Sequence, residues 1–325
     1  MAAHAGVSKS LVSRVLHDSP LVSEGRRAAV LSAINELGYR PNAAARALVR
    51  RRSGTVALLV ADLHNLFLPA VLDALEDTVS GHGLTTLIVS GRRRAHAEEE
   101  GLRRLLELRV EGLVCAAAQI SRTALLEASR STAVVNLTRT PQLPRVDCVV
   151  GDDRAGAGLV VDHLVGLGHQ RIAMIADTQE RAGADRIRGY QAAMTRHGLS
   201  GAVMVEPGGF DEAGGYGAAQ RLLSDRADRP TAIFVASDLS ALGVLDAAAA
   251  AGVTVPQELS IVGYDNTPFA ALRHISLSSV DQSAAEIGTT AAAALLARID
   301  QPDGRARRTV IAPSLVVRRT SGCAP

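Results

Sequence analysis

The 325-residue chain has no tryptophan and only three cysteines, Cys115, Cys148 and Cys323. The cysteines are scattered, odd in number and form no CxxC pair, which argues against a disulfide framework and against a zinc site. They predict a protein that works in a reducing compartment, the cytoplasm. The rest of the sequence likewise predicts neither a cofactor nor a metal.

Long apolar runs are also missing. No stretch of about 18 uninterrupted apolar residues occurs, and the N-terminus has no apolar signal region, so we expect neither a membrane span nor a secretory signal. Apolar residues make up 47% of the chain and charged residues 21%, the composition of a soluble protein. The length suits two or three domains.

Positive charge is concentrated at one end. Residues 1–54 carry nine basic side chains against three acidic ones, a net charge of +6. The whole-chain charge of +2 therefore leaves −4 for the remaining 271 residues. A basic head on a mildly acidic body is typical of a nucleic-acid-binding protein, and a solvated basic face is the lesser alternative on charge alone.

The head begins with "AGVSKSLVSRVL" (5–16), which has the pattern of a helix-turn-helix. Ala5-Gly6 allows a tight turn and Ser8 is a candidate N-cap. The apolar residues that follow recur at helical spacing: Leu11, Val12, Val15 and Leu16. A second helix is expected from Ser23 to Gly38, with an apolar face made of Val30, Leu31, Ile34 and Leu37.

The opposite face of the first of these helices carries Lys9, Ser10, Ser13 and Arg14. Arginine can bond a guanine edge with two hydrogen bonds and serine can bond several base edges, so this face suits the major groove. An ordinary amphipathic helix accounts for the apolar stripe. It does not account for the turn, the basic surplus and the outward serines together.

The sequence of the body predicts an α/β fold. Short apolar runs without polar alternation predict buried parallel strands, and the amphipathic segments between them predict βαβ units. These runs are "TVALLVA" (55–61), "LTTLIVS" (84–90), "GLVCAA" (112–117), "AVVNL" (133–137), "RIAMIA" (171–176), "TAIFVA" (231–236) and "LSIVGY" (259–264). Their number predicts two doubly wound parallel-sheet subdomains, with a ligand cleft at the carboxyl ends of the strands.

The segment from "AGVSKSLVSRVL" to "LGYRPNAAARAL" (5–48) resembles the DNA-binding head of the LacI/GalR family of bacterial transcriptional regulators. The resemblance implies a helix-turn-helix head over 1–40, a hinge helix and linker over 41–54, and a ligand-binding and dimerisation body over 55–325. Within that body, subdomain one covers about 55–153 and 283–310, and subdomain two about 154–282 and 311–325.

The same resemblance implies which residues contact DNA. Lys9, Ser10 and Arg14 would read bases. Residues that would contact or support the DNA backbone are Ser8, Ser13, His17, Ser23 and Tyr39. The hinge segment contains Asn42, Ala45 and Leu48, of which Leu48 would wedge into the minor groove.

One departure concerns the start of the chain. Members of the family begin several residues earlier, with a first helix of which "MAAHAG" is only the tail. A helix of about five residues has too few hydrogen bonds to offset its nucleation cost, so we expect a loosened head. A misassigned start codon or a trimmed chain explains this, and the alternative is a real loss of operator binding.

The body resembles periplasmic sugar-binding proteins, a plan that the regulators share. This resemblance implies a ligand site built from Phe67, Leu68, Arg92, Thr138, Arg186, Phe210, Ser237, Asp265 and Gln282. An aspartate–arginine pair with a serine and a glutamine suits bidentate bonding to sugar hydroxyls. A sugar is therefore the favoured ligand, and a purine or another small metabolite is the alternative.

Enzyme signatures are absent. "DRAGAGLVV" (153–161) is neither GxGxxG nor a P-loop, and Asp152 and Asp153 would point apart on a strand. The arginines at 92–94 suggest a solvated loop. The sequence predicts a homodimeric repressor that binds operator DNA under the control of a small effector. A periplasmic-type solute-binding protein and a sugar-active enzyme are the rival classes.

Overall fold

A computed structural model describes residues 1–16, 19–39, 52–116, 119–137, 143–178, 181–225 and 228–325. The chain divides into two compact units, Met1–Ser53 and Gly54–Pro325. Cys115 and Cys148 are buried free thiols, and Cys323 is an exposed one. In the described part of the chain, no helix has the length and apolar character needed to cross a membrane.

The head contains α1 (Lys9–Leu16) and α2 (Glu24–Glu36). Ser8 caps α1, because its Oγ accepts a hydrogen bond from the Leu11 N–H at 3.2 Å. Gly6 has φ +64°, so the turn before α1 uses the backbone freedom of glycine. The residues before it form one helical turn, with the Ala5 N–H donating to the Met1 carbonyl at 2.9 Å.

The small core of the head is made by valines. Val12, Val15, Val22 and Val30 are buried together. The expected apolar face of α2 is wrong at two positions: Leu31 and Leu37 are 48% and 49% exposed. Helix α1 is short enough to cover only a narrow stripe of α2, so Val30 and Ala33 are buried while the leucines beside them remain in solvent.

Each lobe of the body contains one six-stranded sheet. Sheet A is parallel throughout and has the order β11-β5-β4-β3-β1-β2. Its strands are β1 (Thr55–Val60), β2 (Thr85–Ser90), β3 (Gly112–Ala116), β4 (Ala133–Asn136), β5 (Val146–Gly151) and β11 (Arg308–Ile311). Helices α4 (Leu68–Ser80) and α11 (Ala284–Asp300) cover one face, and α5 (Ala95–Glu107) and α6 (Arg122–Ala128) cover the other.

Sheet B has the order β12-β10-β9-β8-β6-β7, with β12 antiparallel to β10 and the other pairs parallel. Its strands are β6 (Ile172–Ala176), β7 (Met204–Pro207), β8 (Ala232–Val235), β9 (Ser260–Tyr264), β10 (Ser278–Asp281) and β12 (Ser314–Val316). Helices α7 (Asp153–Gly166) and α8 (Arg181–Arg196) pack on one face, and α9 (Glu212–Leu223) and α10 (Asp238–Ala250) on the other. A short 3₁₀ turn, η1 (Ser200–Ala202), precedes β7.

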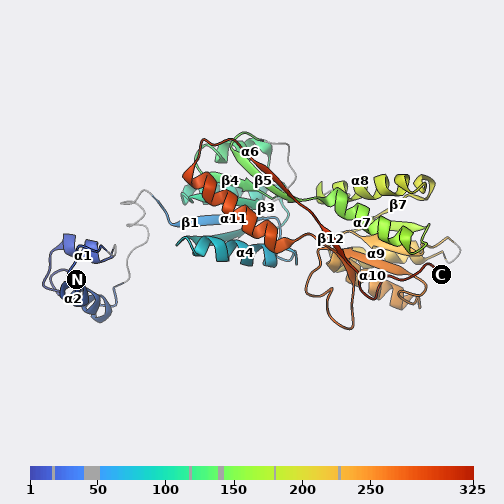
Figure 1. The fold of residues 1–325 in the computed structure, drawn as a ribbon, viewed down its shortest axis with the longest axis horizontal. Coiled ribbons are helices and arrows are strands. Elements are labelled where there is room, and N and C mark those ends of the chain that lie inside the picture. Colours follow the sequence, from blue (N-terminus) through green and yellow to red (C-terminus); the bar gives the residue numbers. More distant parts are fainter. Residues whose placement is uncertain (17–18, 40–51, 117–118, 138–142, 179–180, 226–227) are drawn as a thin grey trace. The chain divides into compact units, whose positions relative to one another are not determined.

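The chain crosses between the lobes three times, after β5, after β10 and between β11 and β12. Figure 1 shows the last of these crossings as a long red segment. All seven strands expected from the sequence form, and the two-sheet α/β plan is confirmed. The burial of β2 on both faces was wrong, because β2 lies at the edge of sheet A and leaves Leu87 and Ile88 exposed.

Candidate functional site

The face of α1 expected to read DNA points into solvent. Lys9, Ser10, Ser13 and Arg14 are all exposed, while Val12 and Val15 on the other side of the helix are buried. Ser23 is the exposed N-cap residue of α2, and Tyr39 follows that helix with 40% of its surface exposed. His17, Asn42, Ala45 and Leu48 lie outside the described residues.

A cavity of about 450 Å³ lies between the two lobes of the body. Its lining includes residues at or just after the carboxyl ends of strands in both sheets: Ala61, Ala116, Leu137 and Gly151 from sheet A, and Asp177, Ser237, Asp265 and Gln282 from sheet B. This placement is the one expected for ligands of doubly wound sheets. Seven of the predicted ligand residues line the cavity: Phe67, Leu68, Arg186, Phe210, Ser237, Asp265 and Gln282.

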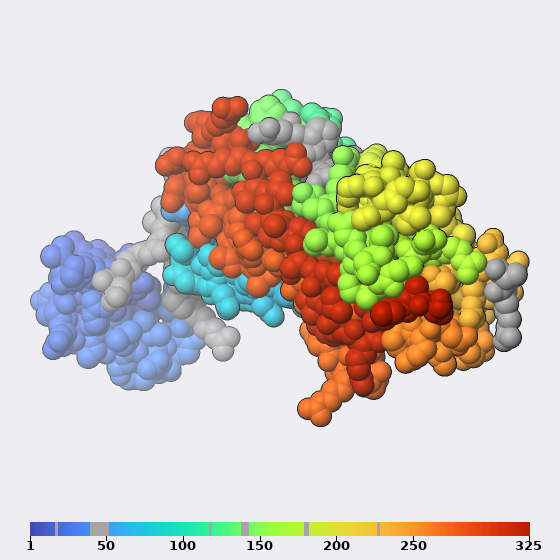
Figure 2. Space-filling model, turned by 45° about the vertical axis from the view of Figure 1, so that its right-hand side comes forward, coloured from blue at the N-terminus to red at the C-terminus, as the bar shows by residue number. Residues whose placement is uncertain are grey.

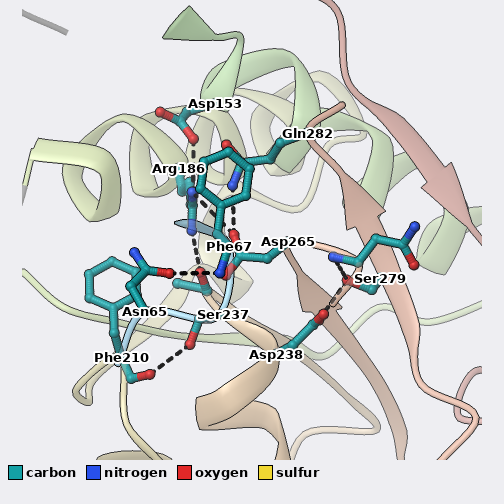
Figure 3. A network of polar contacts seen from close by, with 12 residues as sticks. Asn65, Phe67, Asp153, Arg186, Phe210, Ser237, Asp238, Asp265, Ser279 and Gln282 are labelled. Atoms are coloured by element: carbon teal, nitrogen blue, oxygen red, sulfur yellow. Dashed lines mark hydrogen bonds and ion pairs between the residues drawn. The ribbon is translucent and has the colours of Figure 1, made fainter. Parts of the chain in front are cut away.

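Arg186 is the central cation of this cavity (Figure 3). Its Nε donates to Asp153 Oδ1 at 2.9 Å, Nη1 donates to the Ala236 carbonyl, and Nη2 lies 3.8 Å from Asp265 Oδ1. The guanidinium carbon also lies 3.7 Å from the centroid of the Tyr264 ring, a cation–π contact. The side chain is thus fixed in place before any ligand arrives.

Electrostatics keep Arg186 charged although it is buried. Burial alone lowers the pKa of Arg186, but the carboxylate of Asp153 beside it raises that pKa above its ordinary value. Burial, which lowers the pKa of Arg186, raises the pKa of the Tyr264 hydroxyl well above its ordinary value of 10. The site therefore presents a permanent cation on a neutral aromatic surface.

Asp265 is held in an unusual backbone conformation, with φ 111°. Gln282 Nε2 donates to Asp265 Oδ1 at 2.6 Å. Burial raises the pKa of Asp265 to about 8, against the opposing influence of Arg186. The carboxyl group is therefore protonated at neutral pH, which leaves it able both to donate and to accept a hydrogen bond.

Two phenylalanines supply apolar walls. Phe67 comes directly before α4 of the first lobe, where its N–H donates to Asn65 Oδ1 at 3.0 Å. Phe210 belongs to the second lobe, and its carbonyl accepts a hydrogen bond from Ser237 Oγ at 3.0 Å. The Ser237 hydroxyl also caps α10, so this residue shapes the wall through bonds to the protein itself.

The arginine loop after β2 differs from expectation. Arg92 is exposed and is not among the cavity-lining residues, whereas Arg93 is. Arg93 Nη2 lies 3.6 Å from Asp177 Oδ2 of the second lobe, and its guanidinium lies 5.6 Å from the centroid of the Phe210 ring. The expectation of a merely solvated loop is therefore wrong for Arg93. Thr138 lies outside the described residues.

Sequence reasoning missed Asp153. It expected Asp152 and Asp153 on a strand, but strand β5 stops at Gly151 and both residues begin α7. Asp152 accepts the Ala155 N–H as the helix N-cap, and Asp153 is left to pair with Arg186. The available signal was "VDCVV" (146–150), an apolar run whose recognition as a strand places Asp153 at a carboxyl end.

The cavity thus combines one fixed cation, carboxyl and amide groups and two aromatic rings. Charged and planar donors of this kind recognise hydroxyl groups, and aromatic rings cover the apolar face of a ring-shaped ligand. In the described part of the chain, no group of three or more His, Cys, Asp or Glu side chains could hold a metal ion.

Comparison with known proteins agrees with this architecture. Residues 1–42 match the bacterial regulatory proteins of the lacI family, and residues 161–321 match a periplasmic binding protein-like domain. The Ribose operon repressor of Escherichia coli (strain K12) is 31% identical over 318 residues, which are 97% of this chain and 96% of the relative. The chain belongs to the LacI family.

Solved structures support the same assignment for this LacI-family chain. The lac repressor dimer bound to operator and the anti-inducer ONPF has a TM-score of 0.88 at 26% identity, covering 99% of this chain and 97% of that one. A LacI family transcriptional regulator from Enterococcus faecium with bound ribose has a TM-score of 0.76 at 25% identity, covering 83% and 100%.

Proposed function

We propose that this LacI-family protein is a cytoplasmic, homodimeric repressor whose affinity for operator DNA changes when a sugar binds between the lobes of its body. The observation that carries the proposal is the Arg186–Asp265–Gln282 cluster, buried at the carboxyl end of sheet B and lining the cavity between the lobes, in a chain with a helix-turn-helix head. The protein binds rather than transforms its ligand, and its relatives are regulators.

A sugar fits this cavity better than an anionic metabolite. Besides the protonated Asp265, four carboxyl groups line it (Asp62, Asp153, Asp177 and Asp211) against two arginines, Arg93 and Arg186. An anionic ligand meets repulsion there, whereas neutral hydroxyl groups can donate to carboxylates and accept from Arg186. The ribose found in the Enterococcus faecium regulator supports a pentose as the first compound to test.

Control of DNA binding follows from linkage. A ligand that contacts both lobes favours one relative placement of the lobes, and the hinge enters the first lobe at β1. A sugar that weakens operator binding must itself bind more weakly to the operator complex, and the usual coupling is about 1–3 kcal/mol.

Exposed apolar side chains support the proposed dimer. Leu87 and Ile88 are exposed on the edge strand β2, and Phe269 and Leu272 are exposed on the loop after β9. Figure 2 shows this loop, in orange, standing out from the second lobe. A second copy of the chain would remove these side chains from water.

The base-reading role of Arg14 is directly testable. Arg14→Ala should weaken binding to the preferred operator by about 1–3 kcal/mol and relax the preference at one base pair. Arg26→Ala is the matched control, because Arg26 is an exposed arginine of α2 outside the reading face. Competition binding to operators changed one base pair at a time measures both effects. An equal loss on every sequence in the Arg14 variant contradicts base reading.

The ligand class is testable by thermal shift. A ligand that binds only the folded chain raises its melting temperature, by an amount that grows with concentration. Pentoses, hexoses and nucleobases should be screened in parallel, and the proposal expects a shift with a sugar. A shift with a nucleobase and with no sugar contradicts it.

A further inference from the structure

Sheet A presents a basic edge that the ligand cavity does not use. The loops leading into four neighbouring strands, β11, β5, β4 and β3, each contain arginine. Arg305 and Arg307 precede β11, and Arg308 is its first residue. Arg145 precedes β5, Arg130 precedes β4 and Arg109 precedes β3. Because these strands are parallel, all six arginines lie at the amino-terminal edge of the sheet, the edge opposite the cavity.

The edge is strongly positive for a body whose net charge is −4. The described residues of these loops contain six arginines against two carboxylates, Glu111 and Asp303. Glu111 accepts the Gly54 N–H at 2.7 Å, and Asp303 pairs with Arg145 at 3.1 Å. All six arginine side chains are exposed.

Arginines elsewhere on the body are mostly neutralised by carboxylates. Examples are Arg103 with Glu100 at 2.7 Å, Arg196 with Asp162 at 2.6 Å and Arg229 with Glu258 at 2.9 Å. On the basic edge, by contrast, Arg109, Arg130, Arg305, Arg307 and Arg308 form no side-chain ion pair with any described residue. A row of exposed positive charges that no carboxylate neutralises can bind a polyanion.

The spacing of the basic edge fits a nucleic-acid backbone. Neighbouring strands are about 4.8 Å apart, so four strands spread the arginines over roughly 14 Å. One strand of duplex DNA carries a charge about every 3.4 Å along the axis, so that span faces roughly four phosphates. The chain also enters the lobe from the DNA-reading head at this edge, since β1 begins at Thr55 directly after Gly54.

We propose that the basic edge of sheet A, formed by Arg109, Arg130, Arg145, Arg305, Arg307 and Arg308, is a second DNA-contacting surface that binds backbone phosphates without reading sequence. This inference rests on the proposed function, in that it assumes a chain that acts on DNA. It adds a salt-dependent, sequence-independent contact made by the body itself.

The test is the salt dependence of binding by the full chain to a mixed-sequence 40-base-pair duplex. The edge variant combines Arg130→Gln, Arg305→Gln and Arg308→Gln. The control variant combines Arg94→Gln, Arg122→Gln and Arg273→Gln, three exposed arginines away from the edge, and removes the same charge. Each phosphate contact contributes about 0.9 to the slope of log K against log salt.

The edge variant should lower that slope by about 2.7, since it removes three contacts, and weaken binding at 50 mM salt at least tenfold, with the control close to the wild type. Lysine at the same three edge positions should restore the slope and also shows that the fold tolerates substitution there. Equal slopes in the edge variant and the wild type overturn the inference alone. Equal losses in both variants also overturn it, since net charge then suffices. A wild-type chain that binds no DNA contradicts the proposed function as well.

Discussion

Replacing Arg186 with methionine should lower the free energy of unfolding by about 3–5 kcal/mol, because it leaves the buried Asp153 carboxylate without its cation. The Ala236 carbonyl and the Tyr264 ring lose their partner in the same step. Denaturation by urea measures the change, and ligand-induced stabilisation by the sugar should disappear along with it.

Arg188→Met provides the matched control for Arg186→Met. Arg188 lies on the same helix, two residues later, but its side chain is mostly exposed. It pairs at 3.1 Å with Asp185, which keeps Arg154 as a second partner at 3.1 Å. Exposed pairs contribute about 0–1 kcal/mol, so this variant should remain close to the wild type. A loss below about 1 kcal/mol in Arg186→Met, or equal losses in both variants, contradicts the central role given to this cation.

The free energy of unfolding of Asp265→Asn should increase relative to that of the wild type as the pH rises. The folded wild type keeps a proton on Asp265 up to about pH 8, whereas the unfolded chain releases it near pH 4. Between these values the folded state binds more protons, so the wild type loses stability at about 1.4 kcal/mol per pH unit from this group. Asparagine has no such titration and can still accept the hydrogen bond from Gln282.

Comparing Asp265→Asn with the wild type isolates this group from the others that titrate. His169 is one of these, since burial lowers its pKa and stability from that source falls as pH falls below about 6.5. Urea denaturation at pH 5, 6, 7 and 8 should show the advantage of the variant growing at each step. An advantage that stays constant over this range contradicts a protonated Asp265.

The fold was predictable where strands are buried and apolar, with the exception of β5, which is buried but contains Asp147 and was not recognised. The seven runs recognised in the sequence become the strands that form the centres of both sheets, together with β2 at the edge of sheet A. Strands β7 and β11 escaped recognition because they are partly or largely exposed and contain residues such as Glu206 and Arg308. Strands β10 (SSVD) and β12 (SLV) contain only one and two apolar residues, too few to stand out as an apolar run.

The site was predictable where family resemblance aligned well. Phe67, Arg186, Phe210, Asp265 and Gln282 all line one cavity although up to 215 residues separate them in the chain. What failed depended on contacts between segments far apart in the sequence. Neither the pairing of Arg93 with Asp177 nor that of Asp153 with Arg186 leaves a local pattern, because each joins segments brought together only by the fold.

The central claim is that a sugar in the cavity between the lobes controls DNA binding by the head. The most direct measurement is the operator affinity of the full chain with and without the sugar found by thermal shift, for the wild type and for Asp265→Ala. The account predicts a change of about 5–150-fold in the wild type and less than twofold in the variant, with equal operator affinities in the absence of sugar. A wild-type affinity that does not change at saturating sugar, or a variant that responds as the wild type does, contradicts it.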